Sequence, residues 1–171
     1  MSYQFRRKTI GEILIEQGDL AAAELSFVLD KQKTTPLRFG RICVMDGLVS
    51  DEAVARALAT QFGYEFADLS EFTMDEEILA ELPPDTMYRY RFIPMERVDE
   101  TLAIAIADPT DVVRLDELEI LLDRPLTIRI ASENSFKTSV AGRPSFNAFS
   151  VLIPWIAVAL SGITKPSGLI I

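Results

Sequence analysis

The sequence predicts an α+β fold: an N-terminal helical tandem-repeat subdomain, a small α/β subdomain with a short sheet, and an apolar C-terminal helix. Three patterns lead to this prediction. Residues 9–61 repeat one apolar pattern with helical spacing. Residues 92–107 alternate as two strands around a turn. Residues 146–163 form an uncharged, mainly apolar run. We therefore divide the chain into subdomains at 1–69 and 70–136, a linker at 137–145 and an apolar tail at 146–171.

The repeat emerges when the sequence is shifted against itself by 29 residues. Glycines, a glutamine and the apolar positions then stay in register over 24 residues, which exceeds what chance would give. The matched pairs include Gly11 with Gly40, Ile13 with Ile42, Gly18 with Gly47, Leu25 with Val54, Leu29 with Leu58, and Gln32 with Gln61. Each copy is predicted as helix, turn and helix, with Gly18 ending the first helix and Ser50 capping the last.

The second subdomain is predicted as a mixture of short strands and helices. Residues 66–69 are extended, and a helix over 74–82 ends at Pro83 and Pro84. Strands over 92–98 and 102–107 flank a turn at Asp99, and 126–131 forms a further strand. Between them, 111–122 is an amphipathic helix, and Ser132 caps a final helix. The apolar side of the amphipathic helix carries Val112, Leu115, Leu118, Leu121 and Leu122.

The apolar tail leaves two interpretations open. Its uncharged run of 18 residues is at the lower limit for a membrane span, and it also suits a terminal helix packed on the core. Because the chain ends on the apolar residues Gly168 to Ile171, a membrane segment is favoured.

Composition excludes several functions. The formal net charge of -9 argues against a DNA- or RNA-binding protein. Residues 1–41 nevertheless hold seven basic against five acidic residues, and this local excess favours a small anionic ligand near the N-terminus. Histidine, the commonest general base and metal ligand, is absent. Cys43 is the only cysteine, which indicates a cytoplasmic setting. No phosphate-binding loop, nucleophile motif or metal-binding motif is present, so we expect no catalysis and no metal site.

Two similar helical units side by side suit a ligand that itself has twofold symmetry. Gly11 and Gly40 would let a phosphate or a purine approach the backbone closely, and Arg38 is placed to contact it. The alternative is that both glycines serve only helix packing.

Residues 9–32 and 38–61 resemble the two 24-residue motifs of the MshEN domain, RLGxx[LVI][LVI]xxG[LVI][LVI]xxxxLxxxLxxQ, separated by the same five-residue spacer. The segment from 84 to 135 also resembles the second half of that domain in type II secretion ATPases. The resemblance implies binding of one cyclic di-GMP molecule as a regulatory ligand, half by each motif. The implied contacts are Thr9, Ile10, Gly11, Leu14, Leu25, Leu29 and Gln32 from copy one, and Arg38, Phe39, Gly40, Cys43, Val54, Leu58 and Gln61 from copy two.

The resemblance also implies a partner. Such domains precede secretion and pilus ATPases and occur in some bacterial membrane glycosyltransferases, and the apolar tail favours the latter, tethered to the inner membrane. Two departures from the motif favour a rival function: Thr9 replaces arginine, a loss for which Arg7 and Lys8 could partly substitute, and Asp19 replaces an apolar residue. The rival is a protein-docking module that engages an inner-membrane platform protein without binding nucleotide.

Overall fold

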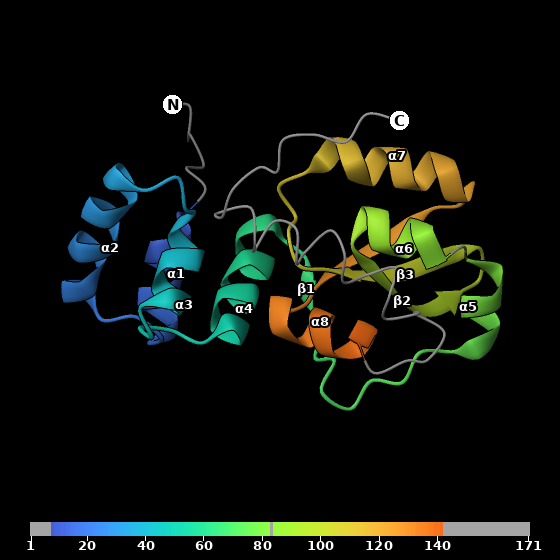
Figure 1. Cartoon of the computed structure of the whole chain (residues 1–171), viewed down its shortest axis with the longest axis horizontal. Helices are drawn as coiled ribbons and strands as arrows, with labels where there is room; N and C mark the ends of the chain where they lie inside the picture. The colour runs from blue at the N-terminus through green and yellow to red at the C-terminus, as the bar shows by residue number, and fades with distance from the viewer. Residues whose placement is uncertain (1–7, 83, 142–171) are drawn as a thin grey trace, which may run out of the picture.

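The computed structural model describes residues 8–82 and 84–141, and it confirms the α+β class. Four helices form the repeat: α1 (Ile10–Gln17), α2 (Ala22–Thr34), α3 (Phe39–Met45) and α4 (Asp51–Phe62). α1 packs mainly on α4, while α2 packs on α3, so the first helix of each copy rests on the second helix of the other copy. The repeat is therefore an interlocked pair rather than two separate hairpins, with α2 at its outer edge (Figure 1).

Local signals set the ends of these helices as predicted. Gly18 ends α1 in the left-handed conformation (φ 81°), and the Ser50 hydroxyl caps α4 by accepting from the Ala53 N–H at 3.0 Å. Thr9 is the N-cap residue of α1, a role that the sequence analysis did not predict. Its hydroxyl accepts from the Glu12 N–H at 3.3 Å, and its own N–H donates to the Glu12 carboxylate at 2.7 Å. This capping box fixes the start of α1.

The second subdomain is built on a four-stranded sheet of order β1-β4-β3-β2. Its strands are β1 (Glu65–Phe66), β2 (Phe92–Val98), β3 (Thr101–Ile106) and β4 (Leu126–Ile130). β2 and β3 form the predicted hairpin, and β4 pairs parallel with both β3 and β1. Helix α7 (Val112–Leu122) makes the crossover that two parallel neighbours require.

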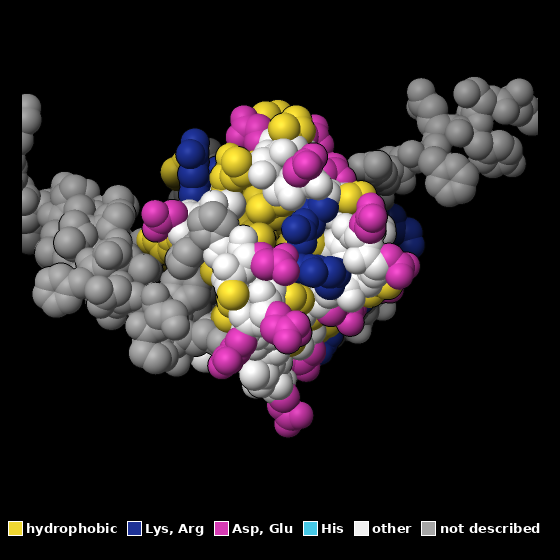
Figure 2. Space-filling model, turned by 90° about the vertical axis from the view of Figure 1, so that its right-hand side faces the viewer, with side chains coloured by type: hydrophobic (Ala, Val, Ile, Leu, Met, Phe, Trp, Pro, Cys, Tyr) yellow, Lys and Arg dark blue, Asp and Glu magenta, His cyan; other side chains and the backbone are white. Residues whose placement is uncertain are grey.

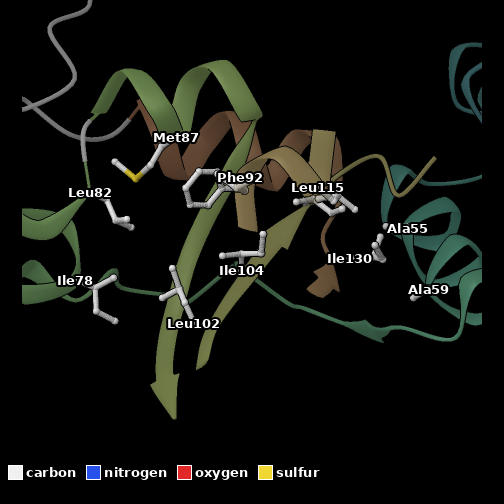
Figure 3. Packing of buried hydrophobic residues seen from close by; sticks show 12 residues of the cluster. Ala55, Ala59, Ile78, Leu82, Met87, Phe92, Leu102, Ile104, Leu115 and Ile130 are labelled. Atoms are coloured by element: carbon white, nitrogen blue, oxygen red, sulfur yellow. The ribbon is translucent and has the colours of Figure 1, made fainter. Parts of the chain in front are cut away.

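Helices cover both faces of this sheet. Phe92, Leu102, Ile104 and Ile130 point to one face, where they pack with Leu118 of α7, Met87 of α6 (Pro84–Tyr90) and Ile78 of α5 (Glu76–Glu81) (Figure 3). On the other face, Ile93 and Ala105 pack against Phe136 of α8 (Glu133–Ala141) and against Leu69 and Met74.

Helix α4 belongs to two cores at once. Ala53, Val54 and Ala57 pack within the repeat, whereas Ala55 and Ala59 belong to the core of the sheet (Figure 3). Small side chains on opposite sides allow this helix to lie close to both neighbours. The repeat and the sheet therefore share helix α4, which packs in the cores of both.

The structure departs from the predicted elements at four places. Pro84 begins α6 instead of only ending the previous helix, because its fixed φ suits the first turn of a helix. Helix α8 continues through Ala141, so residues 137–141 of the expected linker are helical. β1 is shorter than the expected segment. Leu121, predicted on the apolar side of α7, is 56% exposed, and α7 packs on the core through Leu115, Leu118 and Leu122.

The predicted boundary at residue 69 stays a prediction, although β1 before it already pairs in the sheet. The expected apolar helix at 146–171 lies outside the described residues. Within the part of the chain that the structure describes, no helix is long and apolar enough to span a membrane. Figure 2 shows the end of the molecule that lies on the right in Figure 1. There, acidic side chains surround a small basic group, in keeping with the acidic excess beyond residue 41.

Candidate functional site

A cavity of about 560 Å³ lies between the second copy of the repeat and the end of the sheet. The parallel strands β3 and β4 both end here, and the antiparallel strand β2 begins here, since Phe92 pairs with Ile106. In open α/β sheets, ligands bind beyond the carboxyl ends of parallel strands. The cavity occupies that position, and its volume is in the range of small-molecule sites.

Six of the residues implied as ligand contacts line this cavity. They are Ile10, Arg38, Phe39, Gly40, Val54 and Leu58. Five of the six come from copy two, and Ile10 is the only one from copy one. The structure therefore brings together the half-site of copy two, and it places that half-site against the second subdomain.

The two motif glycines are covered by side chains. A Cβ built on Gly11 would lie 2.8 Å from Leu25 Cδ1 and 3.1 Å from Phe39 Cζ, and one built on Gly40 would lie 2.7 Å from Val54 Cγ1 and 3.5 Å from Ile10 Cδ1. The glycines thus let α1 and α3 pack closely, as the helix-packing alternative predicts. In this arrangement Gly11 is buried and does not line the cavity, whereas Gly40 does.

The other implied contacts lie away from the cavity. Leu14 and Cys43 are fully buried in the core of the repeat, and burial raises the pKa of the Cys43 thiol to about 11. Thr9 caps α1, and the Gln61 amide donates to the Lys8 carbonyl at 2.9 Å. Leu25 packs in the repeat, Gln32 is half-buried, and Leu29 is 43% exposed on α2. These residues support the scaffold or face solvent in this conformation.

Arg38 joins the repeat to the second subdomain. It is the N-cap residue of α3 but makes no cap hydrogen bond, and its guanidinium instead donates to the Asp108 carboxylate at 2.5 Å. Asp108 follows β3 and accepts from both the N–H (3.0 Å) and the hydroxyl (2.6 Å) of Thr110. Burial acts to raise the pKa of Asp108, but the Thr110 hydrogen bonds and the Arg38 charge outweigh it and hold this pKa below its usual value. Asp108 is therefore a fixed anion facing the motif arginine.

A second ionic group lies deeper between the elements. The Glu133 carboxylate, at the start of α8, is 3.5 Å from Arg41, 3.2 Å from Arg91 and 3.8 Å from Lys137. Asp51, the first residue of α4, accepts from the Asn134 N–H at 2.8 Å. All the hydrogen bonds and ion pairs described here between the repeat and the second subdomain therefore come from copy two.

The site residues expected from the sequence all lie in the repeat, so the sequence analysis missed the residues that the second subdomain contributes to the cavity. Asp108 and Glu133 each stand two or three residues beyond the end of a parallel strand, and Arg91 immediately precedes β2. A charged residue just after a parallel strand is a recognisable signal, and it would have pointed to Asp108 and Glu133. The described residues contain no group of three or more acidic or cysteine side chains able to hold a metal ion.

Comparison with known proteins identifies the family of the fold. The MshEN domain model matches residues 62–142, which covers the second subdomain rather than the repeat. A solved structure of MshE with cdg (cyclic di-GMP) superimposes with a TM-score of 0.66 at 31% sequence identity, covering 77% of this chain and 96% of that chain. The N-terminal domain of XpsE shares the fold, with a TM-score of 0.55 at 18% identity, covering 76% of this chain and 90% of that chain.

Among curated proteins, the chain is similar to the type IV pilus assembly ATPase PilB of Myxococcus xanthus (strain DK1622). The identity is 22% over 131 residues, or 77% of this chain and 23% of PilB. It is also similar to the bacteriophage adsorption protein B of Escherichia coli (strain K12), with 28% identity over 111 residues, or 65% of this chain and 15% of that protein. The chain thus spans less than a quarter of the length of either relative.

Proposed function

This chain belongs to the MshEN domain family, and from that premise we propose that it is a non-catalytic regulatory domain that binds cyclic di-GMP. The observation that carries the proposal is the cavity in which Arg38, Val54 and Leu58 of the second motif face the strand ends of the sheet. A guanidinium beside apolar side chains suits a ligand that combines phosphates with purine rings.

Binding would change how the repeat and the second subdomain are joined. Arg38 already contacts Asp108, so a phosphate that takes Arg38 competes with that carboxylate. The ligand would thereby replace a contact between the subdomains and favour a different packing of α3 against the sheet. A ligand shifts an equilibrium only through such differential contacts. We propose that an attached pilus or secretion ATPase, or a membrane glycosyltransferase, responds to this shift.

The covered glycines set a condition on the proposal. Ile10, Phe39 and Val54 present apolar surface where the family motif implies backbone contact, so the purine rings would meet these side chains first. Direct contact with both glycines requires Leu25 and Phe39 to move away from Gly11, and Val54 to move away from Gly40.

The test is calorimetry with cyclic di-GMP on the 171-residue chain and on Arg38→Ala. We expect binding by the wild type and a loss of about tenfold to a hundredfold in affinity in the variant, because a charged hydrogen bond contributes about 1.5–3 kcal/mol. Arg38 is an exposed side chain, so its removal leaves the fold intact. Lys33→Ala, which removes an exposed cation of α2, is the matched control and should bind as the wild type does.

A protein-docking module is the second candidate, and a surface of α7 favours it. Val113, Ile120 and Leu121 are exposed on the outer side of this helix, Ile120 to 80%. Exposed apolar side chains gathered on one helix are typical of protein interaction sites. If neither the wild type nor Arg38→Ala binds cyclic di-GMP, docking becomes the preferred function.

A further inference from the structure

The cavity contains a second basic group that the family motif does not include. Arg41 comes from α3, Arg91 from the turn before β2, and Lys137 from α8, and all three lie within 4 Å of the single Glu133 carboxylate. Three cations face two carboxylates here, Glu133 and Asp51, which leaves this corner with a net positive charge. Such a corner attracts a further anion.

The charge of the whole cavity stands out against that of the chain. Its lining includes five basic residues and four acidic ones, whereas the chain has 17 basic and 26 acidic residues. The basic members are Arg38, Arg41, Arg91, Arg114 and Lys137. The cavity is thus a locally cationic region in an acidic protein, which suits an anionic ligand.

The backbone at Arg91 points to the same function. Arg91 has φ 54°, a left-handed conformation that glycine adopts freely and that a long side chain adopts at a cost. Residues held in such conformations cluster at functional sites. Asp99 and Asp123 share this conformation at turns elsewhere, and of these three residues only Arg91 lines the cavity.

The first copy of the repeat explains why a second basic group is needed. Cyclic di-GMP carries two phosphates, and the motif implies one arginine for each, but copy one has Thr9 in place of its arginine. Arg41 lies one helical turn beyond Arg38, and its side chain faces the same cavity. Arg41 of copy two, together with Arg91 and Lys137 of the second subdomain, can therefore supply the cation that is missing at position 9.

We infer that Arg41, Arg91 and Lys137 form a phosphate subsite that holds the second phosphate of the nucleotide. This inference rests on the proposed function. It places the second phosphate beside the strand ends of the sheet. Binding then needs both subdomains, instead of two equivalent halves of the repeat.

The experiment is calorimetry with cyclic di-GMP on the full chain and on Arg91→Gly and Arg41→Gln. Arg91→Gly removes the charge while relieving the left-handed backbone, so loss of folding does not account for weaker binding; thermal denaturation verifies this. We expect affinity to fall about tenfold or more in each variant, as for loss of a charged hydrogen bond. Arg97→Gln is the matched control, because Arg97 lies near the other end of β2, pairs with Glu81 and does not line the cavity.

The outcomes separate this inference from the proposed function. Wild-type binding that weakens in Arg91→Gly and Arg41→Gln, but not in Arg97→Gln, supports the subsite. Wild-type binding that falls in Arg38→Ala and is unchanged in both new variants overturns the subsite and leaves the proposed function standing. A wild type that does not bind cyclic di-GMP overturns both.

Discussion

The two copies of the repeat share a sequence pattern but differ in their surroundings. In copy two, α4 is buried on opposite sides, by α1 and α3 within the repeat and by β1, β4 and α8 beyond it. In copy one, α2 packs mainly on α3, Val28 is its only buried residue, and Phe27 and Leu29 are exposed. Leu58 contributes to two cores, whereas its equivalent Leu29 is 43% exposed.

This difference shows that a motif does not fix the role of its residues. The same apolar position is core, cavity wall or solvent-exposed surface, depending on the element that lies beside it. The second subdomain packs against α4 of copy two, and copy two there forms one side of a cavity. Substitutions at equivalent positions of the two copies therefore test the comparison directly.

The largest difference in stability is expected between a substitution at position 59 and one at the equivalent position 30 of copy one. Ala59→Asp places in copy two the residue that copy one already has, but Ala59 is 3% exposed in the core of the sheet. An unpaired carboxylate there should lower the free energy of unfolding by about 3 kcal/mol or more. Asp30→Ala, at an exposed site, should change it by no more than about 0.5 kcal/mol. Urea denaturation measures both, and equal effects would contradict the comparison.

A smaller difference in stability is expected between alanine substitutions of the two motif glycines, Gly11 and Gly40. Alanine in a helix gains about 1 kcal/mol over glycine. In Gly40→Ala the new methyl group meets Val54 Cγ1, part of a stiff, buried side chain, and overpacking of this kind costs about 1–3 kcal/mol. In Gly11→Ala the nearest atom is the end of the more flexible, half-buried Leu25.

We therefore expect Gly40→Ala to be the more destabilising, by about 1 kcal/mol, and Gly11→Ala to be nearly neutral. Thermal denaturation of the two variants checks the order. A more stable Gly40→Ala would show that Val54 has room to move, and would weaken the argument that this glycine is needed for packing.

Thr9→Arg should lower stability about as much as Gly40→Ala does, while the phosphate subsite predicts that it leaves the affinity for cyclic di-GMP unchanged. Thr9→Arg restores the motif arginine but removes the cap of α1, at a cost of about 1 kcal/mol. If copy one still takes part in binding, affinity for cyclic di-GMP should rise about tenfold, as for one added charged hydrogen bond. Thr9→Ala loses the same cap without adding a charge, so it isolates the stability effect. Unchanged affinity in Thr9→Arg would mean that the ligand lies away from copy one.

Much of the fold could be predicted because its signals are local. Gly18, Ser50 and the alternation on either side of Asp99 each act within a few residues, and the structure confirms the helix end, the cap and the hairpin they predict. Helix α6 was missed because Pro84 was interpreted only as a residue that ends helices. Leu121 was misplaced because α7 has apolar residues on its outer side as well.

The site was less predictable because it is not local. Arg38 and Asp108 are 70 residues apart in the sequence, and only the pairing of β3 with β2 and β4 brings Asp108 to the cavity. The spacing of the repeat shows that Gly11 and Gly40 are equivalent. It does not show that the side chains of Ile10 and Phe39 reach across the axis to cover them.

Helix α4 gives the domain a mechanical property. Ala57 lies in one core and Ala59 in the other, only two residues apart on a helix about 18 Å long. A helix of this length turns as a rigid rod, and no hinge separates its two sides. A rotation of α4 that repacks Ala57 in the repeat would therefore also move Ala55 and Ala59 against the sheet.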